Sequence, residues 1–154
     1  MQANSTMIKT NDKAPVKCRK SIRINAGNKK VWSVLTEIND WPRWQKDIIS
    51  SKLNGELKNG ASFDWKSGGV KIHSTVHTVE PFQGLGWTGN APGTFAIHNW
   101  TMTEKDGNTE VVVDESLEGF FPRLFKSSFS RNLEKGMQSW LESLKKECEK
   151  NPDL

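Results

Sequence analysis

The residues best suited to chemistry in this 154-residue sequence are a histidine and a glutamate, His98 and Glu115, on two neighbouring predicted strands. Segments 94–103 and 109–118 both alternate like strands. Asp106-Gly107 between them favours a two-residue hairpin turn, because both central residues of that turn need a positive φ. Counting outward from the turn places His98 opposite Glu115, on a face whose other pairs are Ala96–Leu117, Trp100–Val113 and Met102–Val111. The two polar side chains are therefore predicted to point inward together.

An imidazole beside a carboxylate in an apolar setting can do two kinds of chemistry. The carboxylate fixes one tautomer of the ring and leaves the other nitrogen available to a ligand carbonyl or hydroxyl. The same pair can serve as a general base if a substrate proton lies within reach. A third interpretation is a buried pair that is satisfied internally and only structural.

A second hairpin, with Gly68-Gly69 as its turn, is predicted to present a similar inner face. That face carries an aromatic and aliphatic set: Phe63, Trp65, Val70, Ile72, Ser74 and Val76. His73 and His77 fall on the other face by parity and are interpreted as surface histidines. Four residues apart on a strand, they do not form the helical pair of a metal site, and no cysteine or carboxylate cluster completes a ligand set. We predict no metal and no cofactor.

The rest of the chain supplies the elements that position these residues. Residues 1–15 are polar and unpatterned, and we expect a mobile or loosely docked arm. Segment 16–25 alternates as a half-buried strand, and two short helices follow it, the second with Pro42 near its first turn. Short strands fill 48–118, and the reverse face of the 94–118 hairpin is predicted to face solvent. One long helix begins at about Pro122, with an apolar stripe that starts at Leu124 and Phe125.

Composition narrows the function classes. The sequence has 22 basic and 18 acidic residues, a formal net charge of +4, and its lysines are scattered, so nucleic-acid binding is not indicated. No apolar run approaches the ~20 residues of a membrane helix, and no hydrophobic signal segment is recognised, which predicts a cytoplasmic protein without integral membrane association. Cys18 and Cys148 are then most simply free thiols, with a disulfide between them as the alternative. Composition leaves the oligomeric state open.

Seven segments in chain order carry a family resemblance. They are Val31-Trp32, Trp41-Pro42-Arg43-Trp44, Phe63-Asp64-Trp65-Lys66, Val79-Glu80-Pro81, Leu85-Gly86-Trp87-Thr88-Gly89, Ala96-Ile97-His98-Asn99-Trp100 and Glu115-Ser116-Leu117-Glu118-Gly119. Together they resemble the polyketide cyclase/dehydrase and lipid-transport family of the START-like (SRPBCC, helix-grip) superfamily, over about residues 16–150. The resemblance implies an α+β fold in which a curved antiparallel sheet grips the long C-terminal helix, with two short helices after the first strand. It also implies an interior cavity for a hydrophobic or amphipathic small molecule.

The candidate ligand-binding residues combine this cavity with the parity of the strands: Trp65, Trp87, His98, Trp100, Glu115, Phe121 and Phe125. Large flat side chains suit an apolar pocket with few polar groups, although core packing is the alternative for each tryptophan. Phe121 and Phe125 stand near the start of the last helix, where a gate would lie. Trp41 and Trp44 either help form the entrance or fasten the short helices to the sheet.

Three functions remain open from the sequence. The first is binding of a hydrophobic or amphipathic small molecule, as a carrier, storage protein or sensor. The second is a cyclase- or dehydratase-type enzyme that uses the same cavity, with His98 and Glu115 as acid and base. The third is a module whose groove takes an apolar segment of a partner protein.

Overall fold

The computed structural model describes residues 7–151. Within them, seven antiparallel strands form one curved sheet in the order β1-β7-β6-β5-β4-β3-β2, so that β2 to β7 are a meander and β1 pairs with β7. The elements are, in chain order, β1 (Val16–Ile24), α1 (Asn28–Thr36), the 3-10 helix η1 (Ile38–Asp40), α2 (Trp41–Trp44), β2 (Ile48–Asn54), β3 (Ser62–Ser67), β4 (Val70–Glu80), β5 (Gly84–Ala91), β6 (Thr94–Lys105), β7 (Asn108–Glu118), α3 (Phe120–Leu124) and α4 (Lys126–Lys150).

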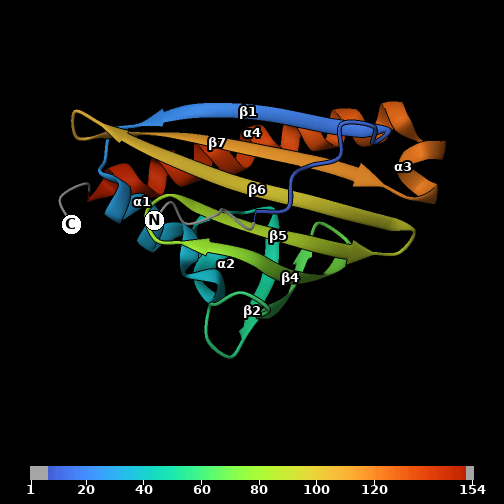
Figure 1. Cartoon of the computed structure of the whole chain (residues 1–154), viewed down its shortest axis with the longest axis horizontal. Helices are drawn as coiled ribbons and strands as arrows, with labels where there is room; N and C mark the ends of the chain where they lie inside the picture. The colour runs from blue at the N-terminus through green and yellow to red at the C-terminus, as the bar shows by residue number, and fades with distance from the viewer. Residues whose placement is uncertain (1–6, 152–154) are drawn as a thin grey trace.

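The helices lie on one side of the sheet and at its two ends. Helix α4 runs behind β1 and β7, with α1 near one end of the molecule and α3 at the opposite end (Figure 1). The two short helices predicted after the first strand are confirmed, and Pro42 stands in the first turn of α2, where its missing N–H removes no helical hydrogen bond.

Both predicted hairpin registers are confirmed. Asp106 and Gly107 have φ values of 55° and 78°, as a two-residue turn requires, and His98 lies opposite Glu115. In the other hairpin Gly68-Gly69 forms the turn, and the strands pair outward from Ser67 and Val70. Correct registers put both predicted inner faces toward α4.

The helix predicted from Pro122 onward is not continuous. Phe125 leaves helical geometry, with φ of −114° and ψ of 45°, and separates α3 from α4. The N–H of Phe121 donates to the carbonyl of Gly93 over 3.2 Å, so α3 is tied to the β5–β6 turn, whereas α4 follows the sheet. Leu124 and Phe125, predicted to begin the apolar stripe, are 60% and 51% exposed; the buried stripe starts further along, with Met137, Trp140, Leu141, Leu144 and Cys148.

A cluster of aromatic rings forms the core at the α1–α2 end. Trp41 is fully buried, its indole N–H donates to the carbonyl of Leu35 over 3.0 Å, and its ring centroid lies 5.1 to 5.8 Å from those of Phe63, Trp65, Trp87 and Trp140. Trp44 is also buried. Of the two roles considered for Trp41 and Trp44, fastening the short helices to the sheet is the one that the packing supports, since edge-to-face ring pairs stabilise such contacts.

Residues 7–11 cover part of the face predicted to be solvent-facing. The N–H of Asn11 donates to Ser116 Oγ over 3.0 Å, and the amide of Asn99 donates to the Ile8 carbonyl over 2.7 Å. As a result Ser116 is fully buried and Asn99 is 6% exposed, so the prediction for this part of the face is wrong. Residues 1–6 of the predicted arm lie outside the described residues.

His77 was interpreted as a surface histidine, and the structure shows it half-buried beneath the same segment. It occupies an irregularity in the pairing of β4 with β5, between Val76 and Thr78. Its Nδ1 accepts from the Ile8 N–H over 3.3 Å, and the ring lies over Gly86. Burial lowers the pKa of His77, and the neighbouring Asn99 side chain opposes that shift.

Cys18 is half-buried and Cys148 is buried, and both are free thiols. Burial raises the pKa of Cys148 to about 12. Among the described residues, no helix is long and apolar enough to cross a membrane.

Candidate ligand-binding cavity

A cavity of about 760 Å³ lies between the sheet and the N-terminal half of α4. Strands β3 to β7, the start of α3 and one side of α4 contribute its walls. The lining side chains that matter below are Trp65, Ser74, Trp87, Ala96, His98, Glu115, Leu117, Phe121, Phe129, Asn132, Met137 and Trp140.

Small residues leave this volume unfilled. Gly89, Ala91 and Ala96 line the cavity from β5 and β6, in the stretches next to the turn that joins these strands. A Cβ on Gly89 would lie 3.2 Å from Ser74 Oγ and 3.3 Å from the Ile72 side chain, so a larger residue there would press on the wall. Further along the same strands, Trp87 and Trp100 are buried in the core. The cavity therefore lies beyond the aromatic core, toward the α3 end of the sheet.

His98 is the polar centre of the cavity wall. The residue is 2% exposed, and its Nδ1 lies 2.6 Å from Glu115 Oε1. Because an ionised carboxylate only accepts hydrogen bonds, Nδ1 donates its proton to Glu115. The other ring nitrogen, Nε2, has no hydrogen-bond partner among residues 7–151. Glu115 lines the same cavity, with its side chain 14% exposed.

Aromatic stacking fixes the orientation of that imidazole. The ring of Trp87 is parallel to it, with centroids 4.6 Å apart and 3° between the planes. A ring held by stacking on one face and by a carboxylate at one nitrogen has little freedom to turn. Its free nitrogen, Nε2, is thus held in one position as a hydrogen-bond acceptor.

The predicted tryptophans divide into two roles. Trp65 and Trp87 line the cavity, and the indole N–H of Trp65 donates to Ser74 Oγ over 3.0 Å. Trp100, also predicted as a lining residue, is fully buried in the core and does not line the cavity. It packs behind the imidazole, 5.4 Å from His98 and 5.6 Å from Trp140 between ring centroids.

The two residues predicted to form a gate also lie in different places. Phe121 lines the cavity and is 38% exposed, so it stands at the rim. Phe125 is 51% exposed and lies outside the lining, with its ring centroid 6.5 Å from that of Phe121. The structure therefore brings together five of the seven predicted site residues and leaves out Trp100 and Phe125.

Helix α4 supplies lining residues that were not among the predicted site residues. Phe129, Asn132, Met137 and Trp140 all face the cavity. Their spacing of three to five residues is the signal that could have found them, because such positions share one face of a helix. The same spacing is typical of plain core, which is why it did not distinguish a cavity wall from a filled interior.

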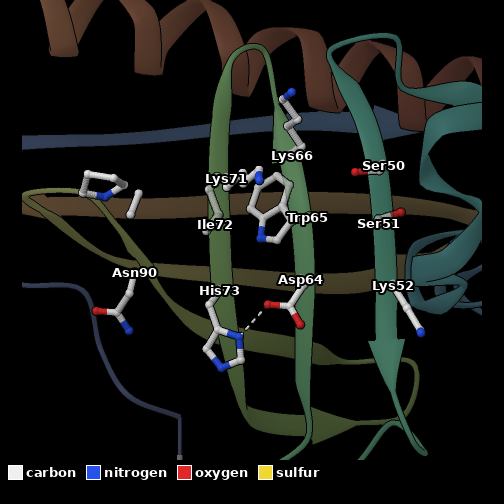
Figure 2. Close-up of a pocket in the computed structure, with 12 residues that line it drawn as sticks. Ser50, Ser51, Lys52, Asp64, Trp65, Lys66, Lys71, Ile72, His73 and Asn90 are labelled. Carbon is white, nitrogen blue, oxygen red and sulfur yellow. Dashed lines mark hydrogen bonds and ion pairs between the residues drawn. The ribbon is translucent and has the colours of Figure 1, made fainter.

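A second, shallower depression of about 670 Å³ lies over strands β2 to β4. Figure 2 shows His73 and Asp64 pointing toward one another there, with Nδ1 and Oδ1 2.7 Å apart. Hydrogen bonds from Asn54 and then from His73 hold the pKa of Asp64 below its ordinary value. Both partners are more than half exposed, which confirms the surface position predicted for His73 and leaves water able to satisfy every polar group. Within residues 7–151, no group of three histidine, cysteine or acidic side chains is arranged to hold a metal ion.

A curved antiparallel sheet around one long helix, with two short helices after the first strand, defines the helix-grip fold of the START-like class. A family model described as polyketide cyclase / dehydrase and lipid transport matches residues 15–149. The chain belongs to this family. Comparison with curated proteins finds no match.

Solved structures share the fold at low sequence identity. A hypothetical protein from Helicobacter pylori superposes with a TM-score of 0.78 at 19% identity, over 93% of this chain and 98% of that one. The Zhui aromatase/cyclase from a Streptomyces species gives a TM-score of 0.79 at 13% identity, over 88% of this chain and 94% of that one. A START superfamily protein from Mycobacterium smegmatis gives 0.64 at 12% identity, over 83% and 98% of the two chains.

Proposed function

We propose that this protein binds a hydrophobic or amphipathic small molecule in the cavity between α4 and the sheet. One observation carries the proposal: a largely apolar cavity of about 760 Å³ contains a buried imidazole nitrogen, His98 Nε2, without a partner in the described part of the chain. A buried polar atom left unpaired costs about 1–3 kcal/mol. A ligand hydroxyl that donates to this nitrogen removes that cost. Membership of a family that includes lipid transport supports the same function.

The wall chemistry indicates how such a ligand would lie. Its polar end would meet His98 deep in the cavity, and its apolar body would extend past Trp65 and Phe129 toward the rim at Phe121. The volume falls within the roughly 300–1,000 Å³ of sites that enclose a small molecule. A mostly apolar cavity with few polar groups in its wall selects for amphipathic compounds rather than for sugars or nucleotides.

Titration with two probes tests the proposal. Dodecan-1-ol and 4-phenylphenol represent an aliphatic and an aromatic compound with one hydroxyl group each, and tryptophan emission reports binding because Trp65 and Trp87 line the cavity. We expect saturable binding of at least one probe, weakened about fivefold or more in His98→Ala, since a buried hydroxyl that loses its acceptor costs about 1–3 kcal/mol. His73→Ala is the matched control, because His73 makes a pair of almost the same length with Asp64 on the surface.

Ala96→Leu provides a second variant that leaves the polar pair intact. Ala96 lines the cavity, so the larger side chain fills volume that the ligand needs. We expect weaker probe binding with no loss of thermal stability. Equal affinity of wild type, His98→Ala and Ala96→Leu, or no saturable binding of either probe, would contradict the proposal.

A cyclase- or dehydratase-type reaction in the same cavity is the second candidate. The contact between Glu115 and His98 favours it. Glu115 orients the imidazole and leaves Nε2 open, as in a general base. Organic extraction of freshly purified protein, with native mass spectrometry before and after, would supply the compound to test. An enzyme converts that compound and loses the conversion in Glu115→Gln, whereas a carrier returns it unchanged.

A further inference from the structure

Helix α3 and the residue after it expose four large apolar side chains in one continuous patch. Phe120 is 67% exposed, Leu124 60%, Phe125 51% and Phe121 38%. Phe120 and Leu124 are four residues apart and share a face of the helix, and the Phe120 and Phe121 rings have centroids 5.4 Å apart. The exposed area is roughly 400 Å² if each side chain offers ~200 Å², a size at which a patch on a monomer is often functional.

Two glycines fix this patch in place. Gly119 has a φ of 114°, which allows the chain to turn from β7 into α3. Gly93, with a φ of 62°, leaves room for the Phe121 ring, since a Cβ there would lie 2.4 Å from it. The Phe121 N–H also donates to the Gly93 carbonyl. The aromatic side chains are therefore held outward by the fold rather than left outside by a loose segment.

The patch adjoins the mouth of the cavity. Phe121 belongs to both, because it is part of α3 and lines the cavity rim. Across the cavity, the β3–β4 turn supplies Gly69 and Val70, and Val70 is 48% exposed. Apolar side chains thus stand on two sides of the opening through which a ligand would pass.

Basic residues border the same surface. Arg123 and Lys126 are exposed beside the four apolar residues, and Lys66 and Lys71 line the cavity on the β3–β4 side. In the described part of the chain, none of these four cations lies within ion-pair distance of a carboxylate. No ion pair in that part of the chain therefore neutralises their positive charge.

We propose that this surface, formed by α3, Phe125 and the bordering cations, docks the protein peripherally on an anionic phospholipid bilayer. Exposed aromatic side chains insert at the boundary between headgroups and acyl chains, and adjacent Lys and Arg side chains attract anionic headgroups. A second copy of the chain fits less well, because a two-fold contact through this patch would bring the same cations together. Resting on the proposed function, the docked orientation turns the cavity mouth toward the bilayer, so that an apolar ligand passes between them with little exposure to water.

Vesicle flotation tests the docking without any cavity ligand. The wild-type chain is mixed with vesicles of phosphatidylcholine alone and of phosphatidylcholine with one quarter phosphatidylglycerol. We expect the wild-type chain to bind the anionic vesicles. Its binding to the neutral vesicles, and to the anionic vesicles in high salt, should be weaker by about tenfold or more. Phe120→Ser with Leu124→Ser should reduce binding to anionic vesicles by a similar factor, and so should Arg123→Glu with Lys126→Glu.

Matched control variants test whether vesicle binding depends on this patch rather than on any exposed apolar or basic side chain. Ile49→Ser removes another apolar side chain that is 60% exposed, on β2. Lys58→Glu with Lys105→Glu reverses two exposed lysines, one in the β2–β3 loop and one at the end of β6. Both should bind like wild type, as should Glu115→Gln, whose change is inside the cavity. Since Phe120 and Leu124 are exposed, their variants should keep the wild-type melting temperature.

Three outcomes would overturn the docking proposal. The first is absence of binding to anionic vesicles, and the second is an equal loss of vesicle binding in the patch and control variants. The third is a wild-type dimer in sedimentation that Phe120→Ser with Leu124→Ser converts to monomer. Because no ligand is present, vesicle binding with failed probe titration would refute only the proposed function. Probe binding without vesicle binding would refute only the docking.

Discussion

His98–Glu115 and His73–Asp64 are two histidine–carboxylate pairs on the same sheet, with nearly equal separations of 2.6 and 2.7 Å. Their surroundings differ: the His98 side chain is 3% exposed and the His73 side chain 54%. Water can satisfy every atom of the exposed pair, whereas His98 Nε2 depends on what enters the cavity. Burial rather than pairing therefore distinguishes the candidate site from an ordinary surface contact.

The inward position of His98 could be predicted because it depends only on alternation and on one hairpin turn. His77 was misplaced because its environment depends on two features that parity does not encode. A pairing irregularity between Val76 and Thr78 turns the strand locally, and Ile8, far away in the sequence, covers the ring. Similarly, parity placed Trp100 on the inner face but could not show that Trp140 would pack against it.

The covered position of His77 predicts a pH dependence of stability. Burial lowers its folded-state pKa below the ordinary value of 6.5, so near that pH the unfolded chain binds more protons than the folded one. The free energy of unfolding should therefore rise with pH through this window, reach its full value above 6.5, and fall as the pH drops toward the folded pKa. Urea unfolding between about pH 5 and 7.5 measures how steeply the free energy of unfolding rises with pH. This slope should be smaller in His77→Gln than in the wild type. An NMR pKa of His77 at or above 6.5, or equal slopes, would contradict this.

Among the elements, α3 shows the limit of a periodic pattern. The apolar spacing continues from Phe121 into the long helix, so a single helix is the natural prediction. What breaks it is a contact with the β5–β6 turn, nearly thirty residues earlier in the chain. The two hairpin registers and the two short helices were predictable because they follow from local turns and short-range alternation.

Gly93 tests how α3 is held. Gly93→Ala combines an unfavourable positive φ with a clash against the Phe121 ring, and we expect a loss of about 2–4 kcal/mol in the free energy of unfolding. Gly68→Ala is the matched control, because Gly68 has a similar φ of 58° with nothing within 4 Å of the added Cβ. Its loss should be only about 1–2 kcal/mol. Equal losses in urea unfolding would mean that Phe121 yields freely and that α3 is not fixed by this contact.

At the scale of the whole molecule, the interior divides into a filled end and an open end. Trp41, Trp87 and Trp100 fill the α1–α2 end, while Gly89 and Ala96 leave the α3 end open. The sequence predicted an apolar interior with an inward histidine. It did not determine how much volume stayed empty, because that depends on how five strands and a helix pack together rather than on any one pattern.

The central claim is that His98 Nε2, inside the cavity, is the polar contact of a bound amphipathic molecule. Because the sequence contains three histidines, their ring nitrogens can be followed individually by NMR during a titration with dodecan-1-ol or 4-phenylphenol. We predict that the His98 resonances shift saturably, with the affinity reported by tryptophan emission, while those of His73 and His77 stay unchanged. Saturable binding of both probes with unchanged His98 resonances would contradict the account.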